Sequence, residues 1–101
     1  MNKRQRIIQH LLEQAQASQR ELLQLRCDQV IGMGRKLRLQ FDNRQCIVGD
    51  MDARREILEW NRKRIADGGY GAPFLGVKKR QLMNDLKVAT GGAGIRGYRL
   101  R

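Results

Sequence analysis

The sequence predicts a mainly α-helical protein with one small β-hairpin, which places the chain in the α+β class. Apolar residues recur at the three- and four-residue spacing of a helix near the start of the chain, again over residues 50–67, and again over residues 76–89. Residues 37–41 alternate apolar and polar side chains, as a half-buried strand does, and a short apolar run follows at residues 46–48. Clusters of glycine separate these stretches, and glycine favours turns over regular structure.

The first helix is amphipathic and a capping signal follows it. Its apolar side is formed by Ile7, Ile8, Leu11, Leu12 and Ala15. Ser18 and Glu21 have the spacing of a capping box, in which a hydroxyl and a carboxylate each satisfy a free backbone N–H at the start of a helix. A second helix is therefore expected to begin at Ser18 and to carry Leu22, Leu23, Leu25 and Val30.

One uninterrupted helix over residues 3–31 is the alternative, because no residue in its middle breaks a helix. Ile8, Ala15 and Leu22 would then recur every seventh residue, as in a short dimer seam. The two-helix arrangement is favoured by the capping box. In either case we expect residues 1–49, helices and hairpin together, to offer a dimer or partner surface.

A β-hairpin is expected after the first glycines. Leu37, Leu39 and Phe41 alternate with polar residues, and a second apolar run, residues 46–48, follows across a polar stretch, residues 42–45. A polar connection of this length suits a hairpin turn. The chain therefore gains one antiparallel pair of strands.

The second half is expected to hold two helices and a final extended piece. Asp50 or Asp52 can cap a third helix, which ends at a pair of glycines where a positive φ is accepted. Residues 68–76 form a loop with the only proline of the chain. A last helix then covers residues 76–89, and a glycine-rich turn leads into an extended piece, residues 95–100.

The charge of the chain points to an anionic partner. Its formal net charge is +11, from 21 Lys and Arg against 10 Asp and Glu. Residues 74–101 contain seven basic side chains and one acidic one, a net charge of +6, which is more than half of the excess. Such a concentration repels itself unless something anionic is nearby.

The last helix separates into an apolar side and a polar side. The apolar side is formed by Leu75, Leu82, Leu86 and Ala89. Arg80, Asn84 and Lys87 fall on the opposite side, with Gln81 near its edge. These side chains can pair with base edges in a major groove. A merely solvated helix face would carry the same residue types, and the concentration of charge favours the binding interpretation.

The same region carries a family pattern. Leu75-Gly76-Val77, a polar helix ending in Asp85-Leu86-Lys87, and a closing Gly97-Tyr98-Arg99-Leu100 resemble the DNA-binding end of winged helix-turn-helix repressors of the biotin-repressor and sugar-operon type. Lys78 stands where that family usually has a Ser or Thr cap. The resemblance implies a winged-helix-like C-terminal half, residues 50–101, with a recognition helix and a wing.

The predicted site divides into two sets. The expected phosphate contacts are Lys78, Lys79, Arg96, Arg99 and Arg101. The expected base-reading residues are Arg80, Gln81, Asn84 and Lys87. The sequence thus predicts a small double-stranded-DNA-binding protein, a transcription regulator of the kind that phages and mobile elements carry. A homodimer would place two copies on two half-sites.

Two other functions remain open. An RNA-binding protein would also use a basic helix and a Gly- and Arg-rich tail, although five aromatic residues leave few platforms for stacked bases. An interaction protein, an inhibitor or adaptor, could dock its basic surface on an acidic host protein, with Trp60, Phe74 and Tyr70 as anchors. The exposure of Trp60 discriminates between these interpretations.

Motifs for catalysis, cofactor binding and metal binding are not found in the sequence. Cys27 and Cys46 belong to no metal-ligand spacing, and His10 reads as a structural histidine on an apolar helix. No apolar run approaches the roughly 18 residues of a membrane span, and the chain opens without the apolar stretch of a secretory signal. We expect no enzyme activity, no cofactor, no membrane association and a cytoplasmic location.

Overall fold

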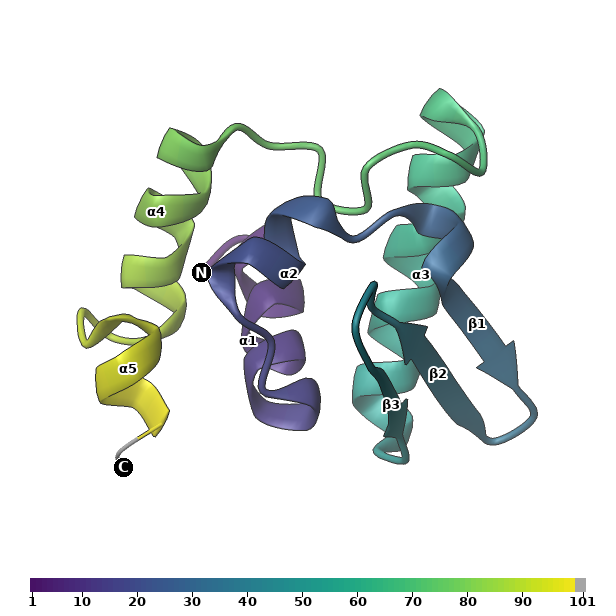
Figure 1. The fold of residues 1–101 in the computed structure, drawn as a ribbon, viewed down its shortest axis with the longest axis horizontal. Coiled ribbons are helices and arrows are strands. Elements are labelled where there is room, and N and C mark those ends of the chain that lie inside the picture. The colour runs from purple at the N-terminus through teal and green to yellow at the C-terminus, as the bar shows by residue number, and fades with distance from the viewer. Residues whose placement is uncertain (100–101) are drawn as a thin grey trace.

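The computed structural model describes residues 1–99 and confirms the α+β class (Figure 1). Leu100 and Arg101 lie outside the described residues, so the predicted contact by Arg101 falls there too. In chain order the elements are α1 (Lys3–Ala15), α2 (Gln19–Gln24), β1 (Val30–Met33), β2 (Lys36–Gln40), β3 (Gln45–Val48), α3 (Met51–Gly68), α4 (Lys79–Ala89) and α5 (Gly94–Arg99).

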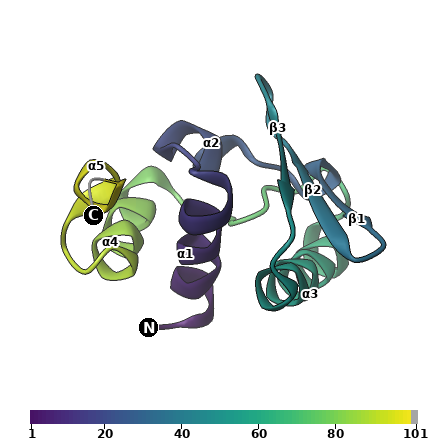
Figure 2. The same cartoon turned by 90° about the horizontal axis from the view of Figure 1, so that it is seen from below.

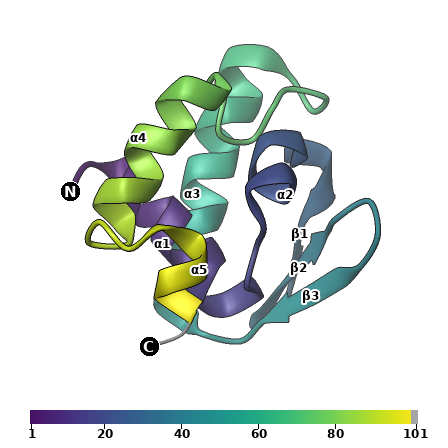
Figure 3. The same cartoon turned by 60° about the vertical axis from the view of Figure 1, so that its left-hand side comes forward.

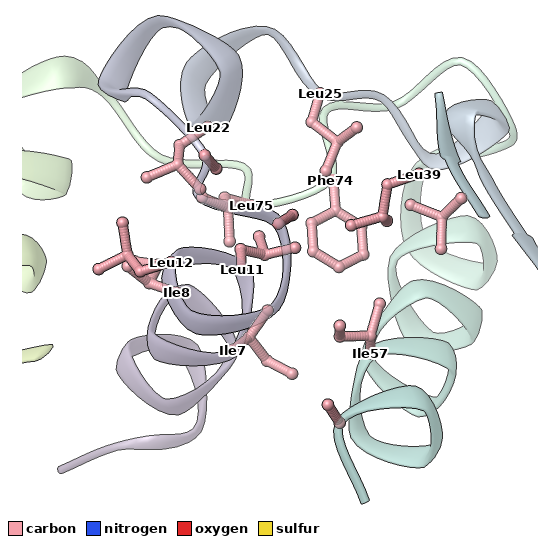
Figure 4. Close-up of a cluster of buried hydrophobic side chains, with 14 of the residues drawn as sticks. Ile7, Ile8, Leu11, Leu12, Leu22, Leu25, Leu39, Ile57, Phe74 and Leu75 are labelled. Carbon is pink, nitrogen blue, oxygen red and sulfur yellow. The ribbon is translucent and has the colours of Figure 1, made fainter. Parts of the chain in front are cut away.

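Helix α1 lies in the middle of the molecule. Helices α4 and α5 cover one side of it, and α3 with the three-stranded sheet lies on the other (Figures 1 and 2). Apolar side chains from every layer meet around α1, and Phe74 of the loop before α4 fills the space between α1 and α3 (Figure 4). The buried stripe of α1 therefore packs against this chain itself.

Two separate helices in the N-terminal region are confirmed, but the second is shorter than predicted, because it ends at Gln24 and Val30 begins strand β1. Helix α1 ends at Ala15, and Gln16 turns the chain with a left-handed φ of 48°. The Ser18 hydroxyl accepts from the N–H of Glu21, and the Glu21 carboxylate accepts from the N–H of Ser18. The alternative of one helix over residues 3–31 is wrong, because the capping box starts a separate short helix. The dimer seam that the long helix would have formed is therefore absent.

Arg44, the residue directly before β3, stabilises the turn between α1 and α2. Its guanidinium donates to the carbonyl of Ala15 at 2.6 Å and to both carboxylate oxygens of Glu21 at 2.9 Å. It also lies over the Phe41 ring, 4.7 Å from the centroid. The hydrogen bonds and charge of Arg44 lower the pKa of the Glu21 carboxyl.

Replacing Arg44 by alanine should lower the free energy of unfolding by about 2 kcal/mol, since a charge-assisted pair and an open helix end lose their partner. Urea denaturation measures the change. The matched control is Arg20→Ala, which removes an exposed arginine from α2. Equal effects of the two substitutions would contradict the role assigned to Arg44.

The sheet has one strand more than the sequence predicted. The predicted hairpin is confirmed as β2 and β3, which pair Leu39 with Cys46. The additional strand β1 pairs with β2 in antiparallel register and is joined to it across Gly34, whose φ is positive. Strand β1 has only four residues, and Gly32 takes a core-facing place against Leu58 of α3. A glycine in that place hides the alternation that would reveal a strand.

The extended piece predicted after the glycine-rich turn is wrong within the described residues, because Gly94–Arg99 forms helix α5. Ile95 and Tyr98 are three residues apart, so a helix directs both to the same side, whereas a strand would direct them to opposite faces. Both pack against the core, and the Tyr98 hydroxyl donates to Glu13 at 2.6 Å. Packing on α1 therefore decides the conformation of this segment.

Candidate nucleic-acid interface

Helix α4 presents the predicted recognition surface to solvent. Its inner side packs on α1, with the four predicted apolar residues buried: Leu75, Leu82, Leu86 and Ala89. The predicted contact residues of the helix and its cap are all exposed: Lys78, Lys79, Arg80, Gln81, Asn84 and Lys87. The division into two sides therefore agrees with the sequence pattern. We call these six residues the α4 surface.

Asp85, the single acid of α4, is fully buried. Arg4 of α1 donates to it through Nε at 2.6 Å and Nη2 at 3.2 Å, and Gln5 donates through Nε2 at 3.1 Å. Burial raises the pKa of this carboxyl, but the hydrogen bonds and the charge of Arg4 outweigh burial, so the pKa of Asp85 is lowered. The residue fixes α4 against α1 as an ionised carboxylate.

The inward position of Asp85 leaves α4 with no exposed acid. Lys79, Arg80 and Lys87 accordingly make no ion pair with any residue in the described part of the chain. The basic residues between α1 and α3 differ, because Glu59 pairs there with both Lys3 and Lys63. The positive charge of α4 is therefore unneutralised, while Glu59 neutralises part of the positive charge between α1 and α3.

Gln81 is less free than the sequence suggested. Its Nε2 donates to Asp85 at 3.3 Å, so the amide is engaged in the support of the helix. Arg80 and Asn84 make no comparable contact within residues 1–99. Base pairing by Gln81 would require its bond to Asp85 to break, whereas Arg80 and Asn84 can act without such a loss.

A shallow depression of about 440 Å³ lies where the preceding loop meets α4. It is lined by Gly76, Val77, Lys78, Arg80, Gln81 and Asn84. The guanidinium of Arg64, from α3, rests against Gly76, whose positive φ of 66° favours glycine, and its Nη2 donates to the Pro73 carbonyl at 3.1 Å. Arg64 thus adds a positive charge beside the depression that the sequence pattern did not indicate.

The start of α4 has no side-chain cap. Lys78 occupies the cap position with extended backbone, and its side chain makes no capping hydrogen bond. The starts of α1, α2 and α3 are capped by Asn2, Ser18 and Asp50. The first N–H groups of α4 therefore keep their partial positive charge beside Lys78 and Lys79.

The predicted wing residues do not join the depression. Arg96 lies exposed on helix α5, where the sequence predicted a strand. It does not line the depression beside Arg80. The backbone of Arg99 ends α5. The structure brings together the predicted residues of α4, and it leaves Arg96 on a separate element.

The three aromatic residues that the interaction-protein alternative uses as anchors differ in their exposure to solvent. Phe74 is fully buried, and Trp60 is half-buried against the core with Nε1 donating to the Phe74 carbonyl at 2.8 Å. Tyr70 is 71% exposed. Phe74 thus cannot contact a partner, and Trp60 has a structural partner for its polar group. His10 likewise bonds Glu56 of α3 at 2.5 Å.

The described residues contain no cluster of three His, Cys, Asp or Glu side chains arranged to hold a metal ion. Cys27 and Cys46 are free thiols, and burial raises the pKa of the Cys27 thiol. None of the helices over residues 1–99 has the length and apolar character to cross a membrane.

Comparison with known proteins adds no relative. No protein-family model, curated protein or solved structure significantly matches the chain. The fold itself defines the class as α+β, with a three-stranded antiparallel sheet and an exposed, basic helix α4.

Proposed function

We propose that this protein binds double-stranded DNA through the α4 surface. The observation that carries the proposal is the unneutralised charge of α4, whose only acid is buried and paired with Arg4. A surface of this kind attracts the phosphate backbone and releases its counterions. The role of transcription regulator rests on the resemblance of Leu75–Lys87 to the recognition helix of winged helix-turn-helix repressors.

The dimensions of α4 suit a major groove. Its 11 residues extend over about 16 Å, and the groove is about 12 Å wide and admits a helix. Arg80, Asn84 and Lys87 follow one side of the helix over roughly 10 Å. Arg80 is suited to guanine and Asn84 to adenine, while Lys78 and Lys79 lie at the end of the helix where phosphates would pass.

A single copy makes these contacts in this proposal. Ile8, Ala15 and Leu22, which would form a dimer seam on one long helix, are all buried within the chain. Two copies on neighbouring half-sites would then be held by DNA or by another surface.

Fluorescence anisotropy tests the proposal with duplex DNA, single-stranded RNA and heparin, titrated from low salt to about 0.15 M. If six phosphates are neutralised, the slope of log affinity against log salt should be about −5. Duplex binding that persists at about 0.15 M and exceeds heparin binding supports the proposal. Preference for single-stranded RNA, or equal loss of all three polyanions, contradicts it.

Replacing Lys78 by serine should separate stability from binding. A Ser hydroxyl can cap α4, so the free energy of unfolding should rise by about 1 kcal/mol. The loss of one phosphate contact should weaken binding to every duplex sequence alike and reduce the salt slope by about 1. Urea denaturation and anisotropy measure the two effects. Lys79→Ser is the control, because it removes the same charge without supplying a cap, and a stability gain there would contradict the capping argument.

A further inference from the structure

The sheet has one face turned away from the helices. Leu37, Leu39 and Val48 are buried on the inner face, and successive residues of a strand point to opposite faces. The alternate residues therefore form the outer sheet face, of which the central members are Ile31, Met33, Lys36, Arg38 and Ile47. Figures 2 and 3 show α3 on the inner side of the sheet and no described element over the outer side.

Two large apolar side chains on this face are open to solvent. Met33 is 45% exposed and Ile47 is 44% exposed. The register places Ile31 opposite Arg38 and Arg38 opposite Ile47, so a cation lies between two aliphatic side chains across the three strands. Ile31, Arg38 and Ile47 thus combine an apolar surface with a single charge at its centre.

Arg38 has an unmet hydrogen-bonding requirement. Its Nε is buried and has no partner among the residues that the structure describes. A buried donor without an acceptor costs free energy, and a carboxylate satisfies an arginine through two parallel bonds. Lys36 lies two residues away on the same face of β2, at roughly 7 Å, and can hold a second carboxylate.

The charge of the face has one sign. The three strands contain no Asp or Glu, and Arg35 adds a further cation at the β1–β2 turn. The outer sheet face also lies across the molecule from α4, so it is separate from the α4 surface (Figure 1). An occupant of the sheet would leave the α4 surface open.

We propose that the outer sheet face docks an acidic segment of another protein, one that carries aliphatic side chains beside its carboxylates. A second copy of this chain would bring cation against cation and is disfavoured. Nucleic acid is disfavoured because no aromatic side chain stands on the three strands to stack a base. The protein would then link DNA on one side to an acidic protein on the other.

A labelled synthetic peptide in which glutamate and leucine alternate is the probe, with the full-length protein observed by ¹H–¹⁵N NMR and by anisotropy. We expect shifts centred on Ile31, Arg38 and Ile47. The same peptide with glutamine for every glutamate should bind at least about tenfold more weakly, and Arg38→Gln should weaken the first peptide by about tenfold. Arg20→Gln, which removes the same charge from α2, should leave its affinity unchanged.

Three results would overturn this inference: equal losses for Arg38→Gln and Arg20→Gln, shifts centred on α4, or single-stranded RNA that shifts the outer sheet face. Duplex DNA distinguishes the two proposals. Arg38→Gln should leave duplex affinity unchanged if both are correct, and absence of duplex binding with intact peptide binding would contradict the DNA proposal alone. A thermal unfolding midpoint within the wild-type range confirms that Arg38→Gln is folded.

Discussion

Asp85→Ala is expected to lower the free energy of unfolding by about 3–5 kcal/mol, as removal of one partner of a buried ion pair does. The carboxylate is fully buried and accepts from Arg4, Gln5 and Gln81. Its removal leaves the Arg4 guanidinium, one quarter exposed, without the charge that compensates it. Urea denaturation followed by circular dichroism measures the loss.

A double-mutant cycle separates the ion pair from the rest of the packing. Arg4→Met combined with Asp85→Leu should cost less than the sum of the two single substitutions, because an apolar pair leaves no buried charge unpaired. Asp67→Ala is the control, since Asp67 is exposed at the end of α3. An additive cycle, or a loss no larger than that of Asp67→Ala, would show that Asp85 does not fix α4 to α1.

The same pair predicts how stability responds to acid. The pKa of Asp85 is lower in the folded protein than its usual value near 3.8, so ionised Asp85 stabilises the fold above that value. This contribution is lost as the pH falls below about 4 and through the lowered folded pKa. Asp85→Asn should therefore flatten the acid limb of the stability curve, and an unchanged limb would contradict the assignment.

Removing three cations of α4 should reduce duplex affinity by about a hundredfold, on the order of 3 kcal/mol. The variant is Lys79→Ala, Arg80→Ala and Lys87→Ala together. These side chains make no ion pair within residues 1–99, so the fold should remain intact. Lys79 is the one expected phosphate contact among the three, so the slope of log affinity against log salt should become less steep by about 1, from about −5 to about −4.

The control removes the same net charge from elsewhere on the surface. Arg20, Arg35 and Arg62 are exposed on α2, on the β1–β2 turn and on α3. Their replacement by alanine should reduce affinity only slightly, because long-range attraction between exposed charges is screened beyond about 8 Å at physiological salt. Equal losses in the two triple variants would mean that net charge, and no particular surface, binds DNA.

Local sequence patterns were sufficient to predict α1, the start of α2, α3, α4 and the β2–β3 hairpin. These elements carry their signals locally. Ser18 and Glu21 mark a helix start by their spacing alone, and the Asp50 cap of α3 is likewise visible in the sequence. The exposed side of α4 follows in the same way from the period of 3.6 residues.

Other features depend on residues far apart in the chain. Strand β1 forms because β2 lies beside it, and α5 forms because Ile95 and Tyr98 both find the core. No local spacing distinguishes a short extended piece from a short helix when the burial of two side chains decides between them.

The sequence by itself determined the charge of this protein, its α+β class and which residues of α4 face outward. The tertiary structure alone decided that Asp85 faces Arg4, 81 positions away, that Arg64 lies against Gly76, and that Arg38 lies between Ile31 and Ile47. The physical reason is that charge and helical period are properties of neighbouring residues. The pairing of a buried carboxylate, or an arginine's lack of a partner, depends on how separate elements pack.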